Sequence, residues 1–394
     1  MANRKDAKGR VLKAGESQRK DGTYMYRYSD IRGNRKSVYA RDLKELREKE
    51  KIVQKDLADG IDYAAGDITA IDLIKRYLKI KENLKETSEN RYQGILRVLE
   101  RYDLFHRKIC SIKQSEAKEW ISDVFSEGKK SGTVHSYLAI ITHAFQQACD
   151  DNILRKNPFN LKSYEYAKDD QACKEALTPE QQKEFLDFVL ADKTGQKHYD
   201  DYNILLGTGL RISEYLGLTT SDIDLVNRVI HVNHQLALVK NSKYKITSLK
   251  SKSGKRDLYI SDEIYESLVR KIHNSNRLDS GVEIDGYTGF INISNRGDSI
   301  TRRGAFNAAL KTLVERHNEQ YPDSPLPSIT PHILRHTFCT NMAMNGINVK
   351  SLQYIMGHSD VKFTLAVYTH VNNEYAVREM QKAIESSKSC LEVV

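Results

Sequence analysis

Six side chains in the second half of the chain have the types needed to cut a phosphodiester bond with a tyrosine. They are Arg211 in TGLRISE, Lys252 in SKSGKR, His332 and Arg335 in PHILRHT, His358 in MGH and Tyr368 in VYTH. Guanidinium groups bind phosphate oxygens through paired hydrogen bonds, and histidine and lysine side chains can move protons. A phenol with a pKa near ~10 becomes a good nucleophile once a base takes its proton. This set predicts phosphodiester cleavage by a tyrosine, without a metal ion or ATP.

Each residue taken alone also fits an ordinary structural role. Glu214 lies three residues after Arg211, so the two could form an ion pair on one helix face. Lys252 lies in the predicted turn Ser251–Gly254, and a lysine in a turn is usually just exposed to solvent. Lys250 and Lys255 flank this turn, so either of them could supply the catalytic ammonium group in its place. We predict that a hairpin tip at this turn reaches a DNA groove, and that the two flanking lysines contact DNA.

A zinc site is the main alternative chemistry that the histidines suggest. His332 and His336 are four residues apart, a spacing that zinc ligands on a helix can have. However, no glutamate follows His332 directly, as the H-E-x-x-H motif requires, and no third ligand stands out. The nucleotide-binding motif G-x-x-x-x-G-K-[ST] does not occur either. We therefore expect neither a metal ion nor an organic cofactor.

The six residues lie in a segment that is predicted to mix helices with a small sheet. Thr178, Pro179 and Gln181 form a capping box that marks its first helix. The other predicted elements are a helix over Asn203–Leu216 that breaks at Gly207–Gly209, strands at Val229–Val232, Tyr244–Leu249 and Asp257–Ile260, a helix after Thr330-Pro331, a helix over Val349–Met356 that stops at Gly357, a short helix around Tyr368 and a tail helix over Glu374–Ser386.

The segment from about Asp67 to Phe159 is predicted to be all-helical. The expected helices are Ala70–Glu82, Thr87–Tyr102, Gln114–Ser126 and Thr133–Asp151. Asn157-Pro158 closes the segment, because the residue before a proline resists helix.

The N-terminal segment combines strand signals with a high positive charge. Residues 1–40 hold eleven Lys or Arg and four Asp or Glu, so most of the net charge of +9 lies there. Strands are predicted at Arg10–Ala14, Thr23–Asp30 and Arg35–Ala40, followed by a helix over Leu43–Ala58. A β-sheet can enter the major groove of DNA. We therefore predict that this sheet contacts DNA through Tyr26, Arg27, Tyr28, Arg35 and Lys36.

The composition indicates more than one folded domain and a polyanionic partner. The chain has 394 residues, 39% of them hydrophobic, and a pI of about 9.0. No apolar run approaches the ~18 residues that cross a bilayer, and MANRKDAKGR lacks the apolar stretch of a secretory signal. We expect a cytoplasmic protein with no membrane partner, whose five cysteines are buried free thiols.

The order and context of the six residues resemble the tyrosine recombinases, also called phage-type integrases. TGLRISE, H-x-L-R-H and GH followed by a tyrosine carry the likeness, which is dense over Thr178–Val371. Within that family, the nearest likeness is to the integrases of conjugative transposons and related integrative elements. Their N-terminal arm-binding sheet resembles the segment KDGTYMYRY and its neighbours. All six family positions are filled, so the resemblance implies an active enzyme.

The resemblance implies a multidomain α+β fold in three parts. These are an arm-type DNA-binding domain at 1–64 (a three-stranded sheet and a helix), an all-α core-site DNA-binding domain at 65–165, and a mainly α catalytic domain at 174–394 with a tail helix. The implied partners are double-stranded DNA at element ends and target site, three further copies of the chain in a homo-tetramer on DNA, and an accessory excision factor. The tail helix would dock either in cis or on a neighbouring protomer.

The resemblance also implies a role for each residue. Arg211 and Arg335 would hold the non-bridging oxygens, and His358 would support the phosphate by hydrogen bonding. His332 would be the base that takes the tyrosine proton, and Lys252 would protonate the departing 5′ oxygen. The product is a 3′-phosphotyrosyl link, which the 5′ hydroxyl of a second strand can reseal.

Two other functions would use parts of the same pattern. A type IB topoisomerase would share the chemistry without partner exchange, and the additional N-terminal sheet argues against it. A non-catalytic DNA-binding regulator would not need the intact set of six residues. The variant Tyr368→Phe separates the classes, because a recombinase would keep DNA binding and lose cleavage, whereas a regulator would be unaffected.

Overall fold

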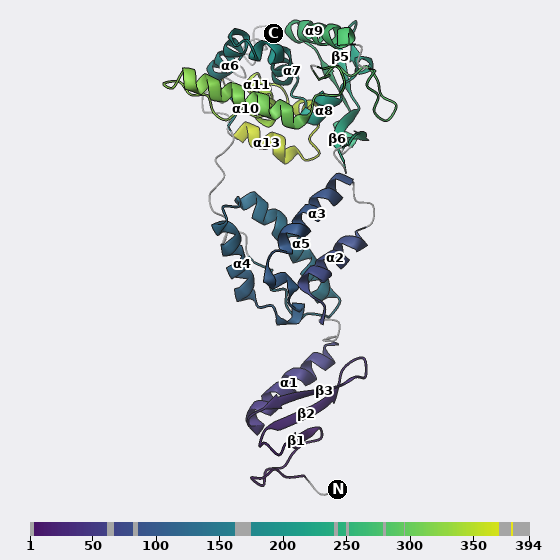
Figure 1. Cartoon of the computed structure of the whole chain (residues 1–394), viewed down its shortest axis with the longest axis vertical. Coiled ribbons are helices and arrows are strands. Elements are labelled where there is room, and N and C mark those ends of the chain that lie inside the picture. Colours follow the sequence, from purple (N-terminus) through teal and green to yellow (C-terminus); the bar gives the residue numbers. More distant parts are fainter. Residues whose placement is uncertain are drawn as a thin grey trace, which may run out of the picture. The chain divides into compact units, whose positions relative to one another are not determined.

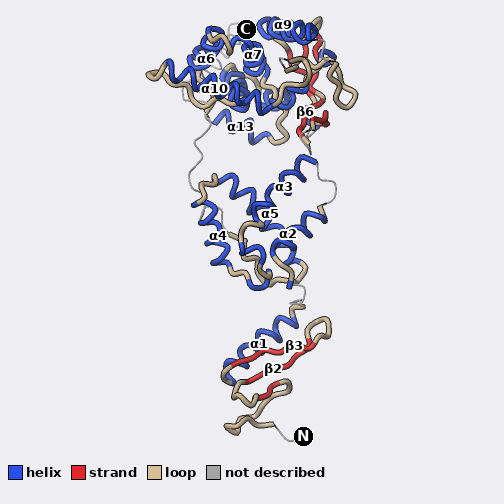
Figure 2. Tube along the Cα trace, viewed as in Figure 1, coloured by secondary structure: helices blue, strands red, loops and turns tan. Residues whose placement is uncertain are grey.

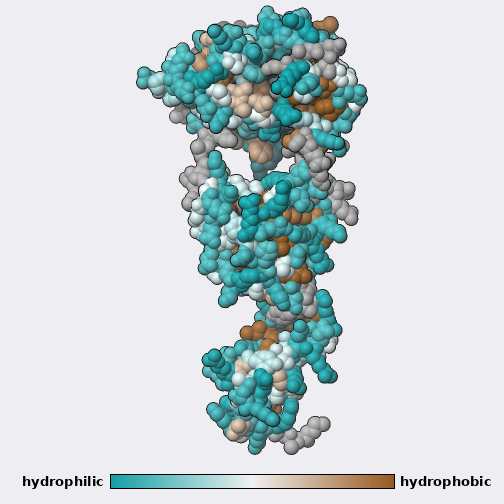
Figure 3. Space-filling view, viewed as in Figure 1, coloured by the Kyte–Doolittle hydropathy of each residue, from teal (hydrophilic) through white to brown (hydrophobic). Residues whose placement is uncertain are grey.

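The structure, a computed structural model, describes residues 4–60, 67–81, 86–161, 175–239, 243–249, 252–278, 281–294, 296–369 and 380. It contains two compact units, Met1–Ala172 and Cys173–Val394, whose helices and strands are shown in Figures 1 and 2. Within the described residues, no helix has the length and apolar character needed to span a bilayer. Hydrophilic side chains cover most of the face seen in Figure 3.

The first unit begins with a three-stranded antiparallel sheet and a helix that packs on one of its faces. The strands are β1 (Glu16–Gln18), β2 (Tyr24–Ser29) and β3 (Arg35–Ala40), and the helix is α1 (Leu43–Ala58). The strand predicted at Arg10–Ala14 is wrong. Asp6 accepts hydrogen bonds from the backbone N–H and the Nε of Arg10, both at 2.8 Å, so this segment closes a local turn and the first strand starts later.

The described residues that follow in the first unit form helices joined by turns and loops, as predicted. Its helices are α2 (Ala70–Ile80), α3 (Glu86–Leu99), α4 (Gln114–Ser126) and α5 (Ser131–Asp150). The core surrounds Trp120, whose ring meets Phe105 edge-on with 5.1 Å between ring centroids. Cys110 in this unit is exposed, which contradicts the expectation of buried thiols, whereas Cys339 in the second unit is buried.

The second unit is mainly helical, with two small sheets. Its helices are α6 (Pro179–Ala191), α7 (Tyr199–Thr208), α8 (Ile212–Gly217), α9 (Asp262–Leu278), α10 (Arg303–Gln320), α11 (Pro331–Met344), α12 (Val349–Met356) and α13 (Val361–Thr369). The predicted caps are present: the side chain of Thr178 caps α6, that of Thr330 caps α11, and left-handed Gly357 ends α12. Long helices α9 and α10 were not identified from the sequence. The predicted tail helix over Glu374–Ser386 lies outside the described residues.

The strands of the second unit pair differently from the prediction. They are β4 (Ile223–Asp224), β5 (Val229–Val232), β6 (His234–Leu238), β7 (Tyr244–Ser248) and β8 (Arg256–Tyr259). β5 pairs with β4 and β8, whereas β7 pairs with β6, a strand that was not predicted. The expected hairpin between β7 and β8 is therefore wrong. The connection between them joins two sheets and contains one 3-10 turn, η8 (Lys252–Gly254).

Gly209 separates α7 from α8 and thereby fixes the position of Arg211, which follows two residues later. Its φ of 62° lies in the left-handed region, where glycine is favoured. A Cβ built on Gly209 would lie 2.3 Å from Cδ1 of Phe338 in α11. The helix break that the sequence predicted thus depends on both backbone conformation and packing.

We expect Gly209→Ala to destabilise the second unit by about 2–4 kcal/mol, because the left-handed backbone and the overpacked contact both cost free energy. Denaturant unfolding followed by circular dichroism reports both units, whereas fluorescence of Trp120, the only tryptophan, reports the first. The fluorescence transition should not move. Gly304→Ala is the matched control, because Gly304 lies in α10 with open space around its Cβ position. Equal transitions for the two variants would contradict the prediction.

Candidate active site

A pocket of about 380 Å³ on the second unit brings together three of the six predicted residues. Its lining comes from the start of α8, from α10 and from the start of α11: Arg211, Ile212, Ser213, Arg303, Asn307, Thr330, Pro331, His332 and Arg335. Arg303 was missed in the sequence analysis, because no local signal separates it from other exposed arginines. The pocket thus has three guanidinium groups and an imidazole at its wall, a lining suited to an anion.

Arg211 is oriented by two contacts from different parts of the unit. It is the residue before α8, and its Nη1 lies 2.7 Å from Oε1 of Glu214, as its spacing suggested. Its Nη2 donates to the carbonyl of Gly357 at 2.8 Å, 146 residues further along the chain. Burial raises the pKa of the Glu214 carboxyl, but hydrogen bonds and charge from Arg256 and Arg211 outweigh burial and hold the pKa below its usual value.

Arg335 is almost completely buried on α11, with 4% of its surface exposed. Its Nη1 donates to the carbonyl of Gly209 at 2.6 Å, and its Nη2 donates to the carbonyl of Met356. Burial, followed by the charge of Arg211, lowers its pKa to about 9, so the group is still a cation at neutral pH. A buried cation beside like charges is costly, and an anion in the pocket would offset that cost.

His358 follows the turn that both arginines contact. Its Nδ1 lies 3.0 Å from Oγ1 of buried Thr364, and this bond orients the ring. Burial of the imidazole, followed by the charges of Arg335 and Arg211, lowers its pKa from 6.5 to about 4. His358 is therefore neutral at neutral pH and can hydrogen-bond a phosphate without carrying charge.

The pKa of His358 predicts a pH dependence of stability. Because the folded-state pKa lies below the unfolded value, protonation favours the unfolded chain. The stabilising contribution is complete above about pH 6.5 and is lost as the pH falls towards about 4. Between about pH 7 and pH 5, wild type should lose more unfolding free energy than His358→Gln, measured by denaturant titration of the second unit. Parallel pH profiles of the two proteins would contradict the assignment.

His332 lines the pocket, whereas Tyr368 is not among the residues that line it. His332 is exposed in the first turn of α11, three residues before Arg335. Tyr368 is half-buried on α13, as predicted for a short helix, and its Oη donates to the backbone carbonyl of Ile347. His336, the second histidine of the zinc alternative, has its Nδ1 3.1 Å from Oγ1 of Thr340.

The lysine position is described only through its backbone. Lys252 begins η8, whereas its side chain and the whole of Lys250 lie outside the described residues. Lys255, the other competitor, is exposed. The turn nevertheless approaches the site, because the carbonyl of Ser253 would lie 3.3 Å from a Cβ built on Gly357.

Arg256 is a site residue that the sequence analysis did not identify. The predicted strand started one residue after it, and Glu214 was paired with Arg211 alone. In the structure, its side chain is fully buried and its Nη2 lies 2.9 Å from Oε2 of Glu214. No local sequence pattern could have indicated this role, because Arg256 and Glu214 are 42 residues apart.

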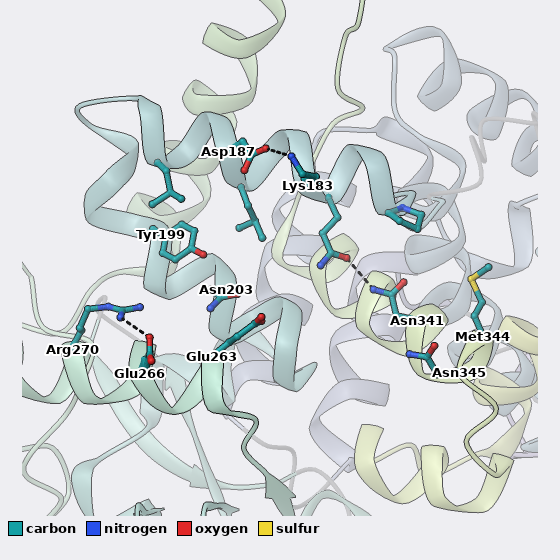
Figure 4. A pocket seen from close by; sticks show the side chains of 14 residues that line it. Lys183, Asp187, Tyr199, Asn203, Glu263, Glu266, Arg270, Asn341, Met344 and Asn345 are labelled. Carbon is teal, nitrogen blue, oxygen red and sulfur yellow. Dashed lines mark hydrogen bonds and ion pairs between the residues drawn. The ribbon is translucent and has the colours of Figure 1, made fainter.

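A larger groove lies elsewhere on the second unit, among α6, α7, α9 and α11 (Figure 4). Four of its charged groups form two ion pairs, Lys183 with Asp187 at 2.7 Å and Arg270 with Glu266 at 3.6 Å. Of the described residues that line it, none belongs to the predicted six. The smaller arginine-lined pocket is therefore the better candidate for phosphodiester chemistry.

The N-terminal sheet divides the five predicted DNA contacts into two groups. Tyr26 is buried and Tyr28 is partly buried against α1, with 5.9 Å between their stacked rings. These two side chains belong to the small core, a position that does not suit contact with DNA. Arg27, Arg35 and Lys36 are exposed. Because side chains alternate along a strand, Arg27 and Arg35 lie on the face opposite to α1.

Comparisons with known proteins give relatives for both the N-terminal part and the second unit. The phage integrase family matches residues 175–375, and the DNA-binding domain of Tn916 integrase matches residues 1–57. The transposases of Tn916 from Enterococcus faecalis and of Tn1545 from Streptococcus pneumoniae are each 40% identical over 392 residues, covering 96% of both chains. A solved structure of the Tn1549 transposon integrase with a circular intermediate DNA is 36% identical, with a TM-score of 0.75, and covers 80% of this chain and 99% of that one. The chain therefore belongs to the phage integrase family and is a site-specific tyrosine recombinase of the conjugative-transposon kind, an enzyme that breaks and rejoins DNA.

Proposed function

We propose that Tyr368 is the nucleophile with which this recombinase cuts double-stranded DNA, at the ends of a mobile element and at a target site, for integration and excision. The observation that carries the proposal is the convergence of Arg211 and Arg335 on one turn. Their guanidiniums donate to the adjacent carbonyls of Gly357 and Met356, directly before His358. Two guanidinium cations and a neutral imidazole thus lie at one turn, an arrangement that can bind a phosphate through charge and hydrogen bonds.

The chemistry assigned to the site balances without a further reactant. Oη of Tyr368 forms a bond to phosphorus while its proton passes to His332, and the bond to the 5′ oxygen breaks. Lys252 gives a proton to the departing oxygen. Arg211 and Arg335 stabilise the extra negative charge of the pentacoordinate state, by ~3–4 kcal/mol per donor. The hydroxyl of Tyr368 donates to the Ile347 carbonyl in the structure, so attack on phosphorus requires the hydroxyl to leave that carbonyl.

The other parts of the chain are proposed to place DNA over this site. We assign residues 1–64 to arm-type sites, 65–165 to the core site and 174–394 to catalysis. Exposed Arg27 and Arg35 support the first assignment, because they give the face opposite to α1 a cationic surface for DNA. Lys36 is also exposed, but it pairs with Tyr28 and lies on the other face of the sheet. Exposed Lys255, together with Lys250, is assigned to DNA contact near the catalytic turn.

The assembly follows from the reaction. Exchange between two duplexes requires four strand cleavages, and each copy of the chain has one nucleophile. We therefore propose a homo-tetramer on DNA, assisted by an accessory protein during excision, that works in the bacterial cytoplasm.

Nicked duplex oligonucleotides taken from the DNA that flanks the gene test the proposal. Cleavage near the nick releases a short fragment, so resealing fails and the covalent intermediate accumulates. A denaturing gel should show a protein–DNA band that retains a label at the 5′ end of the cut strand, as a 3′ linkage requires. Clear DNA binding without any covalent band would contradict the enzymatic assignment and favour a DNA-binding regulator.

A further inference from the structure

Arg256 is the first residue of β8, yet its side chain points into the interior of the unit and is fully buried. Four hydrogen bonds hold it. Nη2 and Nη1 donate to the two carboxylate oxygens of Glu214 at 2.9 and 3.3 Å, Nη1 also donates to the carbonyl of Gly254 at 3.0 Å, and Nε donates to that of Ile355 at 2.6 Å. A guanidinium offers five N–H donors in a rigid fork, which a lysine ammonium cannot reproduce.

Glu214 is shared between Arg256 and Arg211. Its Oε1 lies 2.7 Å from Nη1 of Arg211 and its Oε2 accepts from the backbone N–H of Arg211 at 2.9 Å. The carboxylate is 99% buried, so it needs cationic partners. With Arg256 in place, Arg211 has to satisfy only part of that charge. Without it, Glu214 would draw Arg211 into a full ion pair and away from the phosphate.

The remaining two bonds of Arg256 reach the other parts of the site. Gly254 ends η8, the turn whose backbone includes Lys252, and Ile355 lies in the last turn of α12, directly before the turn that Arg211 and Arg335 contact. A Cβ built on Gly357 would lie 3.1 Å from Nη1 of Arg256, which shows how tightly the turn packs on this guanidinium. One buried side chain therefore joins three segments that are far apart in the sequence.

We propose that Arg256 is a positioning residue for strand cleavage, which holds Glu214, η8 and the end of α12 so that Arg211 is free to bind the scissile phosphate. The proposal rests on the function proposed above. Arg256 contributes through Arg211 and does not itself need to touch DNA. Its loss should therefore slow the chemical step and leave DNA affinity nearly intact.

Single-turnover cleavage of two nicked substrates tests this role. One carries the natural phosphodiester, and the other carries a methylphosphonate at the scissile position, which removes the negative charge that Arg211 neutralises. Arg256→Lys should cleave the phosphodiester about 10–100-fold more slowly than wild type, with Kd for DNA within about threefold. On the methylphosphonate, Arg256→Lys should be slower than wild type by about fivefold or less. A role limited to folding would lower the active fraction equally for both substrates.

Arg270→Lys is the matched control. Arg270 also binds a carboxylate through two nitrogens, with Nε and Nη2 at 3.0 and 2.8 Å from Oδ1 of Asp200, but its side chain is 48% exposed and does not line the arginine-lined pocket. It should cleave as wild type does. If Arg256→Lys shows no cooperative unfolding, Arg256→Gln replaces it with the same expectation.

The outcomes separate the two proposals. Wild type without a covalent band contradicts the proposed function and, with it, this inference. A wild-type band together with unimpaired phosphodiester cleavage by Arg256→Lys, or with equal losses on both substrates, overturns the role of Arg256 alone.

Discussion

Tyr368→Phe should abolish the covalent protein–DNA band, a loss on the order of 10³-fold or more in cleavage rate, because the nucleophilic oxygen is removed. DNA affinity should stay within about twofold, since charge and shape are unchanged. The hydroxyl also donates to the Ile347 carbonyl, so the variant should lose about 0.5–1.5 kcal/mol of stability. Gel analysis with nicked DNA, mobility shift and denaturant unfolding measure the three quantities.

Tyr354→Phe is the control for the loss of a tyrosine hydroxyl from the same unit. Tyr354 lies on α12, is 52% exposed, and its hydroxyl accepts from the backbone N–H of Asp257 at 3.1 Å. It should cleave at the wild-type rate. A covalent band that persists in Tyr368→Phe and disappears in Tyr354→Phe would mean that the nucleophile has been assigned to the wrong residue.

The positions of several site residues could be predicted because local signals mark them. Glycines and caps determine where helices begin and end, so the break before Arg211, the start of α11 at Thr330 and the stop at Gly357 followed from the sequence. Arg211 and Arg335 could be named from their residue type and from the family resemblance of TGLRISE and H-x-L-R-H. What the sequence did not reveal is that both arginines bond to the same turn, which is a property of tertiary packing.

The errors share one physical cause, which is that strand pairing and burial depend on distant residues. Alternation identified β7 and β8 as strands but could not identify their partners, and η8 was therefore taken for a hairpin tip. Alternation also placed Tyr26 and Tyr28 together on one face, but only the structure shows that α1 covers that face. Arg256 was missed because its partners, Glu214 and Ile355, are 42 and 99 residues away.

Arg211→Lys should slow cleavage by about 10²–10³-fold, equivalent to ~3–4 kcal/mol of transition-state stabilisation, although the charge is conserved. Arg211 uses Nη1 for Glu214 and Nη2 for the Gly357 carbonyl, and its planar group still has N–H donors for a phosphate. A lysine ammonium has three donors at a single point and cannot span these partners at once. Single-turnover cleavage of nicked DNA measures the effect.

The salt dependence of DNA binding distinguishes lost geometry from lost charge. Because Arg211→Lys keeps the cation, the slope of log Kd against log salt should match that of wild type, while cleavage alone fails. Arg228→Lys serves as control, since Arg228 pairs with exposed Asp262 outside the pocket and should retain full cleavage. Normal cleavage by Arg211→Lys would show that a point charge is sufficient at this position. The proposed role of Arg256, which acts on Arg211 through the carboxylate of Glu214, would then lose its basis.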